Sequence, residues 1–222
     1  MNFFGHAVVA TWCSRADGFV LGAMLPDFAG MIGERPPRVE HVALERGVAF
    51  HHETDRVFHE SPTFRALQSD ARQKLRALGL PRPSALAVGH IGVEILLDAS
   101  LAKDATAREG YVRAIFAARP AALGAHIAWS DSDAALRFER LREILETRGV
   151  SERAADANAV AWRVARALAG RPRFRLDEQG ERTVLAWAEQ AAYSVAEAAD
   201  SVIAELRAGL RVTLPGAADL AC

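Results

Sequence analysis

Apolar residues recur at spacings of three and four along nearly the whole chain, which is the period of an amphipathic α-helix. The clearest examples are the segments SDAALRFERLREILETRG and RTVLAWAEQAAYSVAEAADSVIAELRAGL. Alternation with a period of two, the pattern of a half-buried strand, is scarce. The sequence therefore predicts an all-α protein, a single-domain helical bundle of roughly eight to nine helices that covers residues 1–222.

Proline and glycine divide this pattern into separate helices. Pro36 and Pro37 interrupt the chain, and Ser61-Pro62 is typical of a helix start, with proline at the first helical position. Gly149 marks the end of another helix. With ends placed to within about 2–4 residues, the predicted helices cover roughly residues 2–14, 17–25, 43–59, 62–78, 84–102, 107–118, 121–147, 151–169 and 180–210.

A stripe of polar residues lies on the predicted helix 43–59, in the segment FHHETDRVFHES. His51, Asp55 and His59 are four residues apart, so they share one face of the helix. Two imidazoles and a carboxylate on one face have the spacing of metal ligands. The alternative is a solvated face on which Asp55 pairs with a neighbouring arginine.

A second stripe lies in the segment ALAVGHIGVEILLDASL, where His90, Glu94 and Asp98 are also four residues apart. The residues between them are nearly all apolar, so this helix is expected to be buried on most of its circumference. A buried carboxylate without a partner costs several kcal/mol or more. Each carboxylate therefore needs an arginine or a cation, and one cation shared by both stripes would satisfy the whole set.

His6 and Asp27 are two further polar residues in apolar surroundings. For His6 alone, a hydrogen-bonded place in the core is the competing interpretation. Mixed imidazole and carboxylate ligands suit manganese, iron or zinc, and magnesium where carboxylates dominate. The predicted metal ligands are His6, Asp27, His51, Asp55, His90, Glu94 and Asp98.

Composition and charge narrow the function classes. The net formal charge is −1, so the chain as a whole has no attraction to nucleic acid or to an anionic membrane. Only two cysteines occur, Cys13 and Cys222, which excludes a disulfide framework and a cysteine zinc site. Neither a positively charged leader nor about 18 uninterrupted apolar residues are found, so a cytoplasmic protein without membrane insertion is expected. Nucleotide-binding and serine-nucleophile motifs are absent from the sequence.

Four segments, taken in order, resemble the acyl carrier protein phosphodiesterase family: MNFFGH, LGAMLPDF, GVAFHHETDRVFHESPTFR and GVEILLDASL. They lie within residues 1–105. The resemblance implies an all-helical, HD-domain-like metal hydrolase fold and a divalent cation, with Mn²⁺ preferred and Mg²⁺, Fe²⁺ or Zn²⁺ as alternatives. It also implies a reaction, hydrolysis of the phosphodiester that joins 4'-phosphopantetheine to a serine of holo acyl carrier protein. The matching positions are His6, Asp27, His51, Asp55 and Asp98.

The chain also departs from that family. Ala49 and Ala99 stand where the family commonly has histidine, and His90 and Glu94 are additions of this chain. A more distant likeness, through His51/Asp55 and His90/Glu94, is to the zinc-dependent phospholipase C and P1-nuclease-like hydrolases. A third interpretation is a non-catalytic protein that binds a metal or another ligand.

Under the hydrolase hypothesis, three residues are candidates for catalysis in addition to metal binding. Asp27 is expected to act as a ligand or a base, and His90 and Glu94 as further ligands or as groups that orient them. An acyl carrier protein is acidic, so it would dock on a basic surface, although arginines on a helix are also common as a solvated face. The oligomeric state stays open. The candidate docking residues are Arg163, Arg166, Arg171, Arg173 and Arg175.

Overall fold

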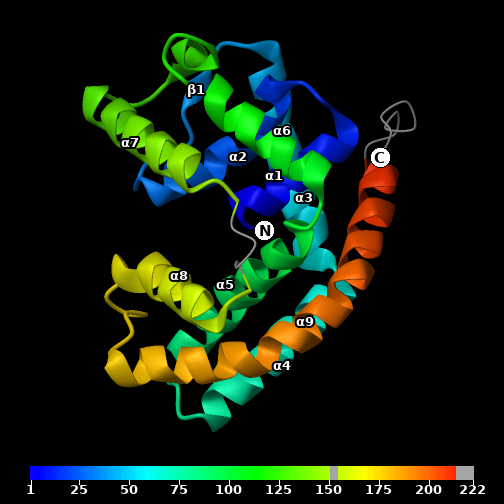
Figure 1. The fold of residues 1–222 in the computed structure, drawn as a ribbon, viewed down its shortest axis with the longest axis vertical. Coiled ribbons are helices and arrows are strands. Elements are labelled where there is room, and N and C mark those ends of the chain that lie inside the picture. The colour runs from blue at the N-terminus through cyan, green and yellow to red at the C-terminus, as the bar shows by residue number, and fades with distance from the viewer. Residues whose placement is uncertain (151–154, 214–222) are drawn as a thin grey trace. The chain divides into compact units, whose positions relative to one another are not determined.

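The computed structural model describes residues 1–150 and 155–213, and within these residues the fold is all-α, as predicted. The described residues form nine α-helices, one short 3-10 helix and two strands of two residues each (Figure 1). In chain order the elements are α1 (Phe3–Cys13), α2 (Asp17–Met31), β1 (Arg38–Val39), α3 (Val42–Glu60), α4 (Pro62–Ala77), α5 (Arg82–Leu101), α6 (Ala105–Ala117), η1 (Leu123–His126), β2 (Ile127–Ala128), α7 (Ser132–Arg148), α8 (Ala157–Ala169) and α9 (Glu178–Thr213).

The chain divides into two compact units. Unit 1 comprises Met1–Val57, Asp104–Ser151 and Leu206–Cys222, and unit 2 comprises Phe58–Lys103 and Glu152–Glu205. Two of the four boundaries fall inside α3 and α9, so each of these helices contributes residues to both units. A single domain over residues 1–222 stays a prediction.

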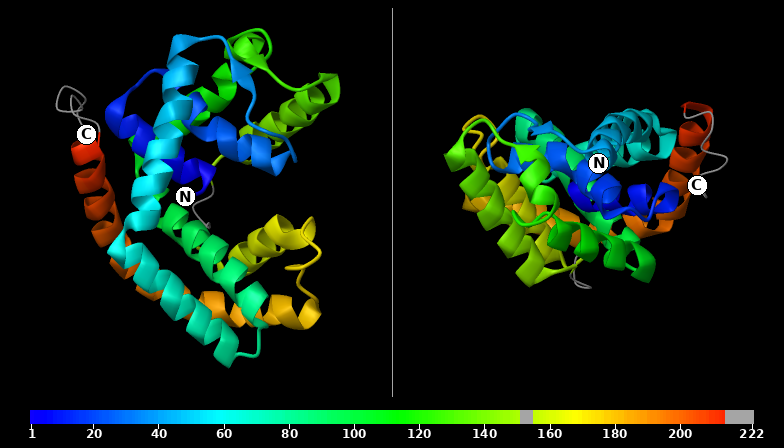
Figure 2. Two further views of the ribbon diagram at one scale, coloured as in Figure 1. Left: turned by 180° about the vertical axis from the view of Figure 1, so that it is seen from behind. Right: turned by 90° about the horizontal axis from the view of Figure 1, so that it is seen from above.

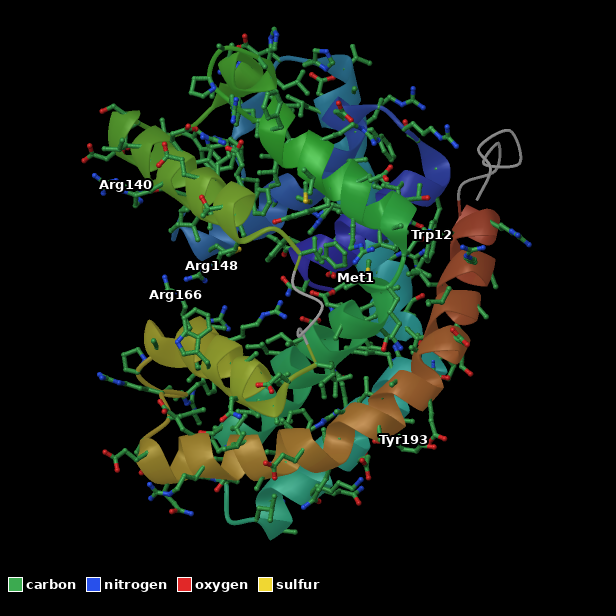
Figure 3. All side chains as sticks on the ribbon, in the orientation of Figure 1. Met1, Trp12, Arg140, Arg148, Arg166 and Tyr193 are labelled. Carbon is green, nitrogen blue, oxygen red and sulfur yellow. The ribbon has the colours of Figure 1, made fainter. Side chains whose placement is uncertain are left out.

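Unit 1 is built around α1, which packs against α2 and α6 (Figure 1). The sequence FFGHAVVATWC is apolar on nearly every side, so the helix can be buried around its circumference. The side chain of Asn2 accepts a hydrogen bond from the Phe3 amide and caps its start. The indole of Trp12, at the other end of α1, lies 4.4 Å from the guanidinium carbon of Arg207, a cation–π contact (Figure 3).

Two glycines allow α2 and α3 to approach closely. A Cβ atom placed on Gly22 would lie 2.3 Å from the Leu44 carbonyl oxygen, and one placed on Gly47 would lie 2.3 Å from the Phe19 carbonyl oxygen. No side chain fits at these distances, so the two backbones touch. This contact brings the main chain of α2 within reach of side chains on α3.

The helix predicted for 17–25 continues beyond Pro26 to Met31, so the predicted end is wrong. Proline lacks one backbone N–H, which costs a single helical hydrogen bond, and the burial of Leu25, Phe28 and Ala29 offsets this loss. Asp27 therefore lies inside α2, one residue after the proline.

The other differences from the predicted helices concern residues 121–169. The helix predicted for 121–147 is interrupted, since α7 begins at Ser132 with the side chain of Asp131 as its cap. The preceding residues form η1 and β2, which pairs with β1 in an antiparallel register. Strands of two residues are too short to show a period in the sequence. Of the helix predicted for 151–169, residues 151–154 lie outside the described residues, and α8 begins at Ala157.

Unit 2 contains α4 and α5 packed together, with α8 against α5. Trp187 of α9 lies so close to Gly92 of α5 that a Cβ atom there would be 2.5 Å from the indole ring. The carboxylate of Glu205 accepts hydrogen bonds from Ser61 and from the amide and hydroxyl of Thr63, and thus ties α9 to the first turn of α4. Glu205 therefore has a structural role at the start of α4. Figure 2 shows the ribbons of both helices from two further sides.

The sequence places Trp129, Trp162 and Trp187 on amphipathic helices and so predicts core positions for them, which the structure bears out only in part. Trp187 is buried, with 1% of its surface exposed. Trp129 is half-buried against Phe138, with ring centroids 4.8 Å apart. Trp162, however, is 50% exposed, so its predicted burial is wrong. It occupies the outer face of α8, whose inner face consists of Val160, Val164 and Leu168.

Within residues 1–150 and 155–213, one helix, α5, is long and apolar enough to cross a membrane by length and composition alone. In the structure, 56% of its most apolar window is buried within the protein. The buried core helix of a folded protein passes the same test of length and hydropathy as a membrane-spanning helix.

Candidate metal centre

Unit 1 brings together four of the predicted ligands, which we call the His6 cluster: His6 of α1, Asp27 of α2, and His51 and Asp55 of α3. One donor atom from each of His6, Asp27 and His51 lies within 4.8 Å of the other two. Asp55 joins them, since its Oδ1 lies 3.6 Å from His6 Nε2. The convergence that the sequence could only assume is therefore present for these four residues.

The ring of His51 is held by the main chain of α2. Its Nδ1 lies 2.9 Å from the carbonyl oxygen of Ala23, at the place where Gly22 and Gly47 bring the two helices together. A carbonyl oxygen only accepts hydrogen bonds, so Nδ1 carries the proton and donates it. The other nitrogen, Nε2, consequently has its lone pair available for a cation.

His6 is held in a similar way by a side chain. Its Nδ1 lies 2.9 Å from the hydroxyl oxygen of Thr54, and its Nε2 faces the two carboxylates. The rings of His6 and His51 are stacked, with centroids 3.9 Å apart. Both imidazoles are thus oriented by hydrogen bonds on the side away from the carboxylates, which is the arrangement of histidines that bind metals.

Burial keeps both imidazoles neutral. It lowers the pKa of His6 to about 3 and that of His51 to about 4, against the nearby carboxylate of Asp55, which acts in the opposite direction. His6 is fully buried and His51 is 7% exposed. At neutral pH both rings are uncharged, which is the protonation state that a metal requires.

The centre of the cluster is rich in acceptors. His6 Nε2 lies 3.6 Å from Asp55 Oδ1 and 4.0 Å from Asp27 Oδ2, and it is buried without a hydrogen-bond partner among the described residues. The amino group of Met1 lies 2.8 Å from Asp55 Oδ1, so a positive charge already contacts this carboxylate. Such a set of acceptors is suited to a cation.

The donor set and its exposure match an open metal site. Two carboxylates can balance the charge of a divalent ion, and two neutral imidazoles add nitrogen ligands. The side chains of Asp27 and Asp55 are 28% and 37% exposed, whereas that of His6 is inaccessible. Solvent or a substrate can therefore reach the cluster from the carboxylate side.

Unit 2 contains a second group, the His90 cluster, made of His59, His90 and Glu94, with donor atoms within 4.8 Å of one another. The rings of His59 and His90 are stacked at 5.0 Å, and Phe64 packs against both. His90 Nε2 lies 3.1 Å from Glu94 Oε1, and the Gln68 amide contacts His90 Nδ1. The His90 side chain is 43% exposed.

Asp98 is the predicted ligand that joins neither cluster. It is buried, and its Oδ2 lies 3.7 Å from Arg163 Nη2 of α8. Pairing with an arginine was the alternative recognised for this stripe in the sequence. His90 and Glu94 do lie together, but eight residues of helix separate His90 from Asp98, about 12 Å along the axis.

The sequence did not indicate several groups that complete these clusters. Thr54 and the Ala23 carbonyl orient the rings of the His6 cluster, and Gln68 contacts His90. His59 was expected on the same face as His51 but belongs with His90. Thr54 lies three residues after His51, so the helical period places the two on neighbouring positions of one face, a signal too common to be diagnostic.

The arginines proposed for docking are mostly exposed. Arg166 lies on α8 (Figure 3), with its guanidinium 5.6 Å from the exposed ring of Trp162. Arg171, Arg173 and Arg175 are exposed in the segment that follows α8. Arg163 differs, because it is partly buried and paired with Asp98. A basic docking surface for an acidic partner stays a prediction.

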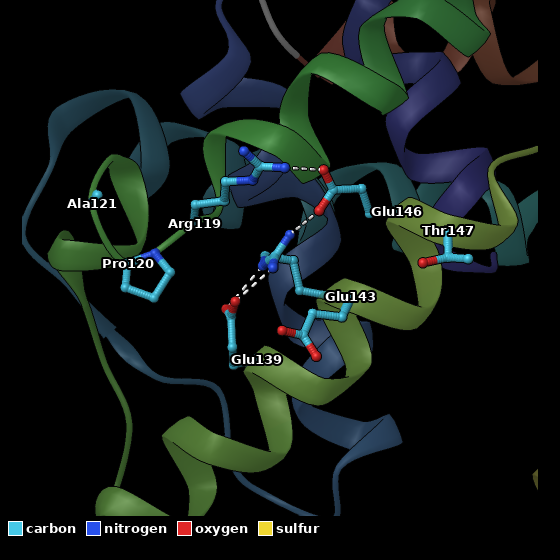
Figure 4. A pocket seen from close by; sticks show the side chains of 8 residues that line it. Arg119, Pro120, Ala121, Glu139, Glu143, Glu146 and Thr147 are labelled. Atoms are coloured by element: carbon cyan, nitrogen blue, oxygen red, sulfur yellow. Dashed lines mark hydrogen bonds and ion pairs between the residues drawn. The ribbon is translucent and has the colours of Figure 1, made fainter.

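A pocket of unit 1 is lined by charged residues of α7 and of the segment after α6 (Figure 4). Arg142 is buried there between Glu139 and Glu146, and Glu146 also contacts Arg119. The hydrogen bonds with Glu139 raise the pKa of Arg142 above its usual range. These ion pairs satisfy the charges at the pocket's centre, and we assign them a structural role.

No family model, curated protein or solved structure matches this chain.

Proposed function

We propose that the protein is a divalent-metal-dependent phosphodiester hydrolase whose cation is held by the His6 cluster. One observation carries the proposal. Two buried, neutral imidazoles have their Nδ1 atoms occupied by Thr54 and by the Ala23 carbonyl, while His6 Nε2 faces Asp27 and Asp55. A hydrogen-bonded core histidine would not need two carboxylates beside its unprotonated nitrogen.

The chemistry follows from this donor set. When bound, a divalent ion lowers the pKa of a coordinated water from about 15.7 towards 7–9 and neutralises charge on phosphoryl oxygens. His6 and His51 supply neutral nitrogen donors that do not titrate near neutral pH. Asp27 has the exposure needed to take a proton from a water molecule on the open side, and Asp55 stays against His6 as a ligand.

The resemblance of residues 1–105 supports a particular substrate, the phosphodiester between 4'-phosphopantetheine and a serine of holo acyl carrier protein, with Mn²⁺ as the preferred ion. The exposed arginines on and after α8 support an acidic protein partner. Weak binding that declines with ionic strength would be the signature of such docking.

The test is an activity assay with matched variants. Protein loaded with Mn²⁺ is assayed for conversion of holo to apo acyl carrier protein and for cleavage of bis(p-nitrophenyl) phosphate. We expect metal-dependent turnover that His51→Ala abolishes and that His126→Ala, a change at an exposed histidine, leaves intact. Cleavage of the generic ester alone would keep the hydrolase and remove the substrate, whereas an inactive metal-loaded protein would remove the hydrolase.

A second candidate is a non-catalytic metal-binding protein. The pairing of Asp98 with Arg163 favours it, because one of the residues matching the phosphodiesterase family is engaged by an arginine. In that case the ion would stabilise the fold without supporting turnover. Thermal unfolding with and without Mn²⁺, beside the assays above, separates the two functions.

The phospholipase C and P1-nuclease-like alternative predicts similar chemistry on other phosphodiesters. The contact between His90 and Glu94 supports it, since this pair belongs to that likeness. Hydrolysis of phosphatidylcholine or of single-stranded nucleic acid in the presence of Zn²⁺, exceeding that of holo acyl carrier protein, would favour this alternative.

A further inference from the structure

We infer that Thr54 is a positioning residue that fixes the tautomer of His6 and thereby sets the preference of the His6 cluster for Zn²⁺ over Mg²⁺. The inference rests on the proposed metal centre, but its first step concerns the protein without any ion. Thr54 was not among the residues that the sequence pattern indicated. Its position on α3, between His51 and Asp55, places it beside both ligands of that helix.

The first step is the direction of the Thr54 hydroxyl. Its Oγ lies 3.0 Å from the carbonyl oxygen of Phe50 and 2.9 Å from that of His51. Both are acceptors, and a hydroxyl has one proton to donate. The Thr54 proton is therefore committed to the backbone of its own helix, a common arrangement for threonine inside helices.

The donor in the contact between Thr54 and His6 follows from the direction of the Thr54 hydroxyl. Since the Thr54 proton points to the backbone, its contact of 2.9 Å with His6 can only be a hydrogen bond donated by His6 Nδ1. Both side chains are fully buried, so bulk water does not offer an alternative partner. The proton of neutral His6 thus lies on Nδ1, and the lone pair on Nε2 points towards Asp27 and Asp55.

The third step is the effect of removing the hydroxyl. His6 Nδ1–H would then lack an acceptor at a buried position, whereas the other tautomer could donate from Nε2 to Asp55, 3.6 Å away in this structure. In that tautomer Nε2 no longer offers a lone pair to the ion. The cluster would retain one imidazole and two carboxylates, a set with a larger share of oxygen ligands.

Ion preference follows from the count of nitrogen donors. Imidazole favours zinc, iron and related ions, whereas carboxylate and water suit magnesium and manganese. Loss of His6 as a donor should therefore weaken binding of Zn²⁺ more than binding of Mg²⁺. A role of Thr54 confined to packing would weaken both ions alike, so the ratio of the two affinities reports on positioning.

The experiment compares Thr54→Val, Thr54→Ser and Thr183→Val in the full-length protein. Valine keeps the shape of threonine without the hydroxyl, serine restores the hydroxyl, and Thr183 is a buried threonine of unit 2 that serves as a matched control. Calorimetric titration with ZnCl₂ and MgCl₂ should show Thr54→Val weakening Zn²⁺ binding by roughly 10–100-fold. We expect a smaller loss for Mg²⁺, recovery in Thr54→Ser and no change in Thr183→Val.

Two further measurements keep the inference falsifiable if Thr54→Val folds poorly. In the metal-free wild type, ¹⁵N-resolved NMR of the imidazole should find the His6 proton on Nδ1, and Thr54→Ser should retain that signature. In a double-mutant cycle, Thr54→Val should add nothing to the loss of Zn²⁺ affinity in His6→Ala, because Thr54 acts through His6.

Several outcomes would overturn the inference: a proton on His6 Nε2 in the wild type, equal losses for Zn²⁺ and Mg²⁺, or additive effects in the cycle. Failure of the wild type to bind any divalent ion would instead remove the proposed metal centre. That result would overturn the part concerning ion preference, while the NMR measurement would still decide whether Thr54 fixes the tautomer.

Discussion

The His6 cluster and the His90 cluster each contain two stacked imidazoles, with two carboxylates in the first and one in the second, yet they differ in how the rings are held. In the His6 cluster, the Ala23 carbonyl accepts the Nδ1 proton of His51. The Thr54 hydroxyl, whose own proton is donated to the backbone, accepts the Nδ1 proton of His6. Both Nε2 atoms therefore present lone pairs. In the His90 cluster, the amide nitrogen of Gln68 contacts Nδ1, so the proton lies on Nε2 and is donated to Glu94.

A group of histidines and carboxylates with suitable spacing therefore does not by itself identify a metal site. The His90 cluster satisfies its own hydrogen bonds without an ion, and its partial exposure lets water complete them. The His6 cluster places two buried imidazoles beside two partly exposed carboxylates, a set of acceptors that a cation would satisfy. The hydrogen-bond partner of each Nδ1 atom therefore indicates whether Nε2 can bind a metal, which the presence of a histidine alone does not.

The largest expected effect tests this comparison directly. His51→Ala should weaken binding of Mn²⁺ or Zn²⁺ by more than the roughly 10–100-fold that loss of an outer hydrogen-bond partner costs, because it removes a ligand. His90→Ala should leave the tightly held ion in place. Elemental analysis after gel filtration, together with calorimetric titration, measures both variants. If His90→Ala loses the ion as completely as His51→Ala does, then His90 and Glu94 are ligands, as the sequence predicts, and the distinction between the clusters fails.

A smaller effect on stability and on metal binding is expected when the close contact of α2 and α3 is disturbed by a mutation. Gly47→Ala places a methyl group against the backbone of α2, which should destabilise the protein by about 1–3 kcal/mol or more and displace the Ala23 carbonyl from His51. Gly30→Ala is the matched control, since no atom lies within 4 Å of its added Cβ. Urea unfolding measures stability, and metal titration measures the site. Equal stability of the two variants would show that the helices can separate without cost.

The third prediction concerns pH and the metal-free protein. Burial lowers the pKa of His6 to about 3 and of His51 to about 4, whereas both are near 6.5 when unfolded. Below pH 6.5 the unfolded chain binds protons that the folded protein does not, so stability falls as the pH decreases towards 4. The slope should approach about 1.4 kcal/mol per pH unit for each histidine.

Urea unfolding in EDTA between pH 7 and pH 5 measures this slope in a range above the titration of most carboxylates. His126→Ala should follow the wild type, because His126 is exposed. In His51→Ala the slope should decrease by the share of one histidine. A stability that stays constant from pH 7 to pH 5 would mean that the imidazoles of the His6 cluster are not buried in neutral form.

Much of the helical fold could be predicted from the sequence, because the period of apolar residues is a local property. The places where prediction failed depend on tertiary contacts. Pro26 reads as a helix end, but burial of the residues after it extends α2. The strand at Ile127 exists only because Arg38 and Val39 pair with it from elsewhere in the chain.

Four residues of the candidate site, His6, Asp27, His51 and Asp55, could be picked out from the sequence, but the way they group in space could not. Spacing of four places His51 and His59 on one face, yet eight residues of helix separate them by about 12 Å, too far for a common ion. The same distance separates His90 from Asp98. The residues that converge on His51 come from α1 and α2, and no local pattern states how three helices pack.

The hydrogen bond from His51 to the Ala23 carbonyl has a consequence for mutational scanning. Residue 23 is already alanine and the group is part of the main chain, so an alanine scan leaves it unchanged, although it orients the candidate ligand His51. Thr54, the corresponding group for His6, would be detected at once. Side-chain mutagenesis can therefore test the hydrogen bond that orients His6 but not the one that orients His51. Replacing the peptide bond after Ala23 by an ester would weaken the Ala23 carbonyl as an acceptor and so test the hydrogen bond to His51.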